Sequence, residues 1–135
     1  MTKSIAVPPN RVVILETAGV ALPLEIARPF VALVPAYDLV ERKQIEAIVL
    51  GLISLGCIEI CCVGPEATAL HEALDMLMLD CKCEHVITTS DVAEAEVIDY
   101  FLWTAGENPS SLLALVSSHP ELIQAIETAA STPRD

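Results

Sequence analysis

A chain of 135 residues is long enough for one domain with a sizeable core, and we expect no second domain. The hydrophobic content is 53%, yet no apolar stretch reaches the roughly 18 residues of a membrane span. Because the N-terminus also lacks a secretory signal pattern, we expect a cytoplasmic protein. The formal net charge of −12 argues against direct nucleic-acid binding, which relies on basic groups that release counterions from phosphates.

The first part of the chain predicts two strands. Residues 1–10 are expected to form a flexible arm, because two adjacent prolines interrupt regular pairing there. Residues 11–16 and 30–36 have the apolar character of strands, and the glycine and prolines between them indicate an irregular loop. Asp38 can then cap a long helix over roughly residues 39–55.

A buried strand over residues 57–64 is the centre of the pattern. Its side chains are apolar on both faces of a two-residue period, with Cys57, Cys61 and Val63 on one face. The Gly64–Pro65 pair then predicts a tight corner before an amphipathic helix that ends near Asp80. Ile58, Ile60 and Cys62 take the opposite face of the strand.

The remaining chain continues the alternation of strands and helices. Residues 85–90 predict a strand, and Ser90 or Asp91 can cap a helix over about 91–105. Residues 111–117 are ambiguous, because Asn108–Pro109 could begin a helix, but the short apolar run favours a strand. A last helix ends at residue 131, and residues 132–135 are expected to be a frayed tail.

This order predicts an α/β fold, because alternating strands and helices form parallel sheets with helices on both faces. We expect one domain over residues 11–131, a three-layer α/β/α sandwich with a mostly parallel five-stranded sheet, flavodoxin-like or Rossmann-like.

The cysteines predict no disulfide framework. There are five, an odd number, and Cys57, Cys61 and Cys62 lie in the central strand, where free thiols act as small apolar groups. The nearest metal pattern is Cys81, Cys83 and His85, which lie in the short connection between a predicted helix and the next strand. Its C-x-C spacing differs from the C-x-x-C of zinc sites, so we expect a turn with incidental thiols, no metal and no cofactor.

The carboxyl ends of the strands are where an α/β sheet binds ligands. The chain places Asp38, Glu66, Thr89 and His119 there, and they are our candidates for a small polar pocket. No dinucleotide motif, phosphate loop or nucleophile elbow accompanies them. Helix capping is the alternative role for Asp38 and for Ser90, Asp91 and Ser118.

A histidine–aspartate pair and one glutamate can each be interpreted in two ways. His71 and Asp75 stand one helical turn apart, which suits either a general acid/base pair or an ordinary surface pair. Glu59 interrupts the apolar central strand, so either the start of that strand is open to water, which we favour, or Glu59 has a partner.

The second half of the chain is one-sidedly acidic, because no Lys or Arg occurs between Lys82 and Arg134. This favours a basic protein partner, with simple solubility as the alternative. Tyr100 and Trp103 suit interface anchors on a flank of the predicted helix, although Trp103 could instead lie at the edge of the core. The candidate partner-binding residues are Glu94, Glu96, Asp99, Tyr100, Trp103 and Glu107.

Residues 56 to about 105 resemble an uncharacterised bacterial domain family with a Gly-Cys strand, a glycine, an acidic helix and a Thr-Thr strand end. The matching positions are Gly56, Cys57, Gly64, Glu72, Asp75, Thr88, Thr89, Glu94 and Phe101. Ser90–Asp91 and Leu70–His71 replace tryptophan-containing pairs of that family. The resemblance implies a compact bacterial α/β domain and no mechanism.

We therefore expect a small non-catalytic interaction protein, of the immunity or regulatory kind, that covers a basic partner such as a nuclease toxin. The alternative is a Rossmann-like enzyme or small-ligand sensor that uses the strand-end loops. The high mean hydropathy, +0.56, also allows a homodimer or other assembly.

Overall fold

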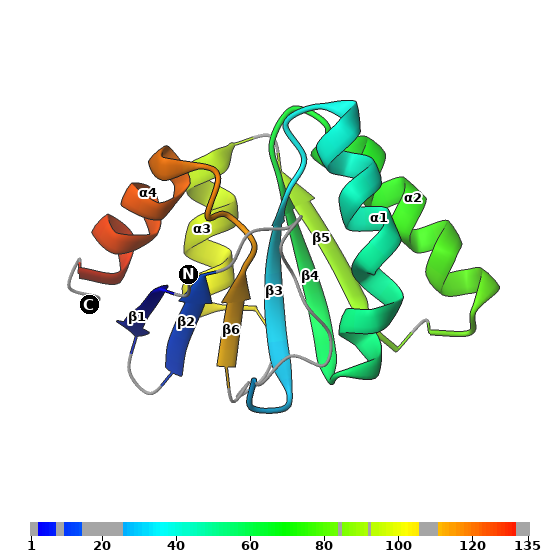
Figure 1. The fold of residues 1–135 in the computed structure, drawn as a ribbon, viewed down its shortest axis with the longest axis horizontal. Coiled ribbons are helices and arrows are strands. Elements are labelled where there is room, and N and C mark those ends of the chain that lie inside the picture. Colours follow the sequence, from blue (N-terminus) through cyan, green and yellow to red (C-terminus); the bar gives the residue numbers. More distant parts are fainter. Residues whose placement is uncertain are drawn as a thin grey trace.

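The computed structural model describes residues 3–7, 10–14, 26–83, 85–91, 93–105 and 111–131. They form a central sheet with helices on both sides (Figure 1). The strands are β1 (Lys3–Val7), β2 (Asn10–Ile14), β3 (Phe30–Pro35), β4 (Cys57–Val63), β5 (Ile87–Asp91) and β6 (Ser111–Ala114). The helices are α1 (Leu39–Ser54), α2 (Ala67–Asp80), α3 (Glu94–Trp103) and α4 (Pro120–Ser131).

The sheet has the strand order β1-β2-β6-β3-β4-β5. From β2 to β5 every neighbouring pair is parallel, and only β1 and β2 are antiparallel. The predicted α/β fold with a mostly parallel sheet is confirmed. The strand interpretation of residues 111–117 is confirmed for residues 111–114, which form β6, whereas residues 115–117 lie outside the strand.

The prediction of a flexible arm over residues 1–10 is wrong for residues 3–7. The predicted sheet of five strands is therefore wrong as well. Residues 3–7 form β1, whose register pairs Ser4 with Val13 and Ile5 with Val12. Residues 3–7 contain no proline, so each of them can take part in a strand. The sheet formed by the described residues therefore has six strands.

Each face of the sheet is covered by two helices, as an α/β/α sandwich requires. Helices α1 and α2 pack on one face, and α3 and α4 pack on the other. The first face buries Ile45, Val49, Leu52, Leu70, Leu74 and Met78 from its helices, and the second buries Val97, Ile98, Phe101, Leu102, Leu122 and Ile126.

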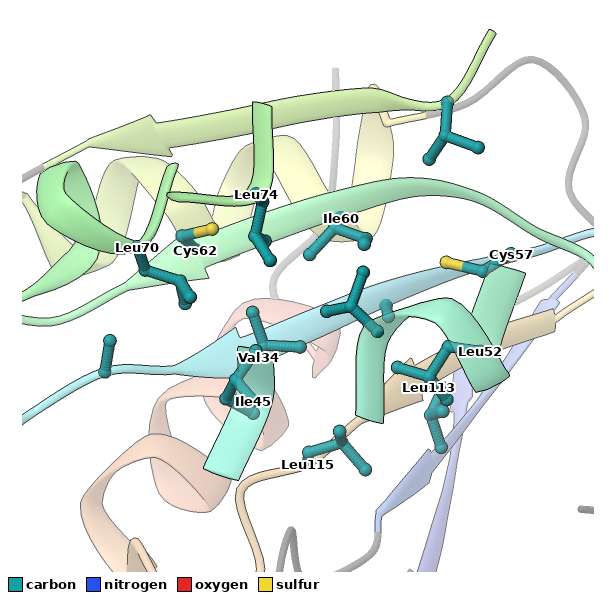
Figure 2. Packing of buried hydrophobic residues seen from close by; sticks show 14 of the residues in the cluster. Val34, Ile45, Leu52, Cys57, Ile60, Cys62, Leu70, Leu74, Leu113 and Leu115 are labelled. Carbon is teal, nitrogen blue, oxygen red and sulfur yellow. The ribbon is translucent and has the colours of Figure 1, made fainter. Parts of the chain in front are cut away.

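Strand β4 lies between β3 and β5, so it is buried on both faces as its sequence predicts. Cys57, however, lies on the α1–α2 face with Ile60 and Cys62, which corrects its expected place beside Cys61 (Figure 2). The register passes from the Phe30–Cys57 pair directly to Val31–Glu59, so one residue of β4 is left out of the pairing. This bulge changes the alternation of faces at the start of the strand.

Helix boundaries differ slightly from those predicted. Asp91 still belongs to β5, and its carboxylate accepts a 2.9 Å hydrogen bond from the Ala93 amide. Helix α3 begins at the next residue, Glu94. Pro120 is the first residue of α4, where a missing N–H costs nothing. Glu107, most of the expected loop before residue 30 and the expected tail lie outside the described residues.

No helix in the described part of the chain has both the length and the apolar character needed to cross a membrane.

Candidate functional site

All four described helices begin at one edge of the sheet, the edge formed by the carboxyl ends of the parallel strands (Figure 1). The first turns carry Glu41 in α1, Glu94 and Glu96 in α3, and Glu121 in α4. Carboxylates are stabilised by the positive ends of helix dipoles. They also compete with any phosphate for those helix ends, so this edge is poorly suited to an anionic ligand.

The strand order reverses between β3 and β6, because β3 leads to α1 on one face while β6 leads to α4 on the other. A cluster of polar side chains occupies this switch point. Glu41 accepts hydrogen bonds from the Tyr37 amide, at 2.9 Å, and pairs with His119 Nε2 at 2.6 Å. The rings of Tyr37 and His119 lie 4.6 Å apart between their centroids.

The Tyr37 hydroxyl extends this switch-point cluster to α3, because it donates a 2.5 Å hydrogen bond to Glu94. Burial, and then the hydrogen bond to Glu94, raise the pKa of Tyr37 above its ordinary value, so the phenol remains a donor. The imidazole of His119 also lies 3.5 Å from Glu121. The cluster thus joins the start of α1, the start of α3 and the turn before α4.

A groove lies between β5 and α3 at the same edge, with a cavity of about 220 Å³. We call it the β5–α3 groove. Its lining combines hydroxyl, carboxylate and apolar groups and consists of Thr89, Ser90, Asp91, Glu96, Val97 and Tyr100. This lining contains two carboxylates and no Lys or Arg, so a cationic or neutral polar guest fits its chemistry.

Glu59 lies behind the wall of the groove and is 2% exposed. The Tyr100 hydroxyl donates a 2.7 Å hydrogen bond to its carboxylate. The favoured interpretation, that the start of β4 is open to water, is therefore wrong, and the alternative that Glu59 has a partner is confirmed. Burial and the hydrogen bond to Glu59 raise the pKa of Tyr100 to about 12.

A hydroxyl, an imidazole and a carboxylate form a chain on the α2 side of β5. Ser90 Oγ lies 2.7 Å from His71 Nδ1, and His71 Nε2 lies 3.3 Å from an Asp75 oxygen. The exposed fractions of the His71 and Asp75 side chains are 31% and 60%, so water screens the charge of Asp75. The order of groups is that of a nucleophile, a base and an orienting acid.

The structure does not bring the four candidate pocket residues into one described cavity. Asp38 caps α1 by accepting from the Glu41 amide at 2.8 Å. Glu66 lies 3.7 Å from the Arg42 guanidinium. Thr89 lines the β5–α3 groove, and His119 belongs to the switch-point cluster.

The candidate partner-binding residues lie along α3, apart from Glu107, which lies outside the described residues. Glu94 is engaged by Tyr37, and Glu96 and Tyr100 line the groove. Asp99 is exposed, and Trp103 is half-buried against the core on the α3–α4 face. The ligand and partner hypotheses therefore meet at one place, the β5–α3 groove.

Sequence reasoning missed Glu41 and Tyr37. Glu41 stands three residues after the capping Asp38, a position where an acid is expected for local reasons, and its bond to His119 spans 78 positions of the sequence. Tyr37 is the second residue after strand β3. Its place at the carboxyl end of a strand is the sequence signal that could have marked it as a site residue.

Among the described residues no group of three or more His, Cys, Asp or Glu side chains is arranged to hold a metal ion.

A family model described as "Domain of unknown function (DUF7684)" matches residues 11–132. Neither the curated proteins nor the solved structures contain a match to the chain.

Proposed function

Because the chain belongs to the DUF7684 family, a domain of unknown function, we propose a role from its geometry: it is an interaction domain that binds a basic protein partner. The β5–α3 groove receives a lysine or arginine side chain of that partner, and the acids of α3 surround it. An inhibitor or regulator that covers a basic surface would act in this way. The single observation that carries the proposal is the cation-free, carboxylate-lined groove.

The chemistry of the groove supports a cationic guest. An ammonium or guanidinium group needs several acceptors, and Asp91, Glu96 and the Thr89 hydroxyl provide them. The Tyr100 hydroxyl donates to Glu59, which leaves its ring and its oxygen lone pairs for the guest. A cavity of about 220 Å³ suits one long side chain rather than a nucleotide.

The charge distribution supports a large basic partner over a small amine alone. Residues 83–133 contain no Lys or Arg and supply the acids Glu84, Asp91, Glu94, Glu96, Asp99, Glu107, Glu121 and Glu127. Summed fields of this kind steer oppositely charged partners and reject acidic ones. The five free cysteines accord with a reducing compartment, and we place the protein in the cytoplasm.

Calorimetric titration with a short oligolysine peptide tests the proposal, with an oligoglutamate peptide as the negative partner. The double variant Asp91→Asn, Glu96→Gln should weaken oligolysine binding roughly 5- to 30-fold, since each exposed charge pair contributes up to about 1 kcal/mol. The matched control Glu72→Gln, Asp80→Asn removes the same charge from exposed positions on α2. It should change affinity by roughly twofold, because distant charges are screened.

Equal weakening by the two double variants would show that only net charge attracts the peptide and would overturn the groove as the site. Failure of the wild type to bind oligolysine at low salt would overturn the proposal as a whole.

A second candidate function, hydrolysis of a small ester, is favoured by the Ser90–His71–Asp75 chain at the carboxyl end of β5. In it Ser90 Oγ attacks the ester carbonyl and His71 takes its proton. The ester C–O bond then breaks, the alcohol leaves with the proton from His71, and water hydrolyses the acyl-serine to the acid and free Ser90. A fluorophosphonate probe should label the wild type and Ser118→Ala, and should fail to label Ser90→Ala. An unlabelled wild type, or labelling that survives Ser90→Ala, would eliminate this candidate.

A further inference from the structure

Helix α2 ends in a Schellman motif that holds two cysteines beside each other. The Cys83 amide donates to the Met78 carbonyl at 2.7 Å, and the Lys82 amide donates to the Leu79 carbonyl at 3.3 Å. These are the two hydrogen bonds that define the motif. Lys82 occupies its left-handed position, with φ of 60°, where glycine is usual. The chain therefore reverses sharply between Cys81 and Cys83.

This reversal brings the two sulfur atoms together. Cys81 Sγ lies 2.6 Å from Cys83 Sγ, which approaches the disulfide bond length of about 2.05 Å. The motif thus pre-organises the pair on the reduced protein.

Cys81 and Cys83 are also the two cysteines that solvent can reach. Cys81 is exposed and Cys83 is partly exposed, whereas Cys57, Cys61 and Cys62 are buried. Burial raises the pKa of the Cys57 and Cys61 thiols to about 12, so these thiols stay protonated and unreactive. An oxidant in solution therefore meets the C-x-C pair before it meets the strand cysteines.

We propose that Cys81 and Cys83 form a reversible dithiol–disulfide site at the end of α2. With a low-molecular-weight disulfide such as oxidised glutathione, the Cys81 thiolate attacks one sulfur and releases one glutathione thiol. Cys83 then attacks the mixed disulfide at Cys81, forms the internal disulfide and releases the second glutathione. The protein loses two electrons and two protons, and the oxidant becomes two glutathione thiols.

Intact-mass measurement of the full chain after exposure to oxidised glutathione tests this site. The wild type should lose the mass of two hydrogen atoms, carry no glutathione, and recover its original mass with dithiothreitol. Peptide mapping should place the bond between Cys81 and Cys83. The Cys83→Ser variant should instead keep one glutathione on Cys81, since no second thiol can displace it.

The buried cysteines provide the internal control, because a thiol-titrating reagent should modify two thiols in the native protein and five after unfolding. A lasting glutathione adduct on the wild type would overturn the proposal. So would a disulfide mapped to the strand cysteines, or an unchanged wild-type mass when the Cys83→Ser variant is modified.

Discussion

The Tyr100 hydroxyl donates a 2.7 Å hydrogen bond to Glu59, a carboxylate that is 2% exposed in the central strand. From Glu59 onward β4 alternates regularly, so Glu59 shares the face of Cys61 and Val63, which α3 covers and where Tyr100 can reach it. One hydrogen bond thus connects the centre of the sheet with the wall of the β5–α3 groove. Changes at Tyr100 should therefore affect both stability and binding.

Replacing Tyr100 with Phe should lower the free energy of unfolding by about 1–3 kcal/mol, since a buried carboxylate loses a donor while the ring is retained. Urea unfolding measures the change. The double variant with Glu59→Gln should be less destabilised than the sum of the two single variants, because they remove the same interaction. Additive effects would show that Tyr100 and Glu59 are not coupled.

Stability should decline at alkaline pH. The pKa values of Cys57 and Cys61 rise from 9.0 to about 12, and that of Tyr100 rises from 10.0 to about 12, because burial disfavours their charged forms. The contribution of these protonated groups to the free energy of unfolding is therefore complete below pH 9 and is lost as the pH rises toward 12. Urea unfolding at a series of pH values measures it, and a flat profile between these limits would contradict the prediction.

Replacing Lys82 with Gly should stabilise the protein by about 1 kcal/mol, because glycine adopts the left-handed conformation without steric cost. Thermal unfolding under reducing conditions measures the gain. Lys43→Gly, in the first half of α1, is the matched control and should destabilise by about 1 kcal/mol. Destabilisation by both changes would show that Lys82 makes contacts that outweigh its backbone strain.

Gly64 should tolerate alanine less well than Gly56, although both have positive φ, at 117° and 109°. A Cβ at position 64 would lie 2.6 Å from the Ala36 carbonyl oxygen, which also accepts the Glu66 amide. At position 56 its nearest contact would be Arg28 Cγ at 2.9 Å, a side-chain atom and not a backbone carbonyl. We expect Gly64→Ala to cost roughly 2 kcal/mol more in urea unfolding, and equal costs would contradict the steric argument.

The switch-point cluster should behave as one unit. Glu41→Ala removes the acceptor for both the Tyr37 amide and His119, so we expect a loss of about 1–3 kcal/mol in unfolding free energy. His119→Ala should cost less in the Glu41→Ala background than in the wild type. Glu72→Ala, at an exposed position on α2, should stay within about 0.5 kcal/mol of the wild type.

Much of the architecture could be predicted because its signals are local. The two-sided apolar pattern of β4, the stripes of Leu70 and Leu74, and the Gly64–Pro65 corner each specify one element over a few residues. Strict alternation then gives the parallel sheet. The strand β1 is not predicted because the two prolines that follow it suggest an irregular segment, whereas residues 3–7 themselves contain no proline.

The candidate site was only partly predictable, since its contacts join residues far apart in the sequence. The sequence predicts Thr89 as a ligand-binding residue and Glu96 and Tyr100 as partner-binding residues, and only the packing of α3 against β5 shows that they share a groove. Glu59 could not be assigned because its partner is 41 positions away. The Ser90–His71 contact likewise requires the register of β5 beside β4.

Six of the seven lysines and arginines precede residue 83, so the layer built by α3 and α4 has no positive charge of its own up to residue 133. The molecule is consequently an electric dipole as well as an anion. If the partner is basic, as proposed, its field would turn this molecule so that the α3–α4 side faces the partner while the two are still separated by solvent. Association with such a partner would then begin from a pre-aligned approach, and added salt would abolish this alignment at long range before it weakens contacts at short range.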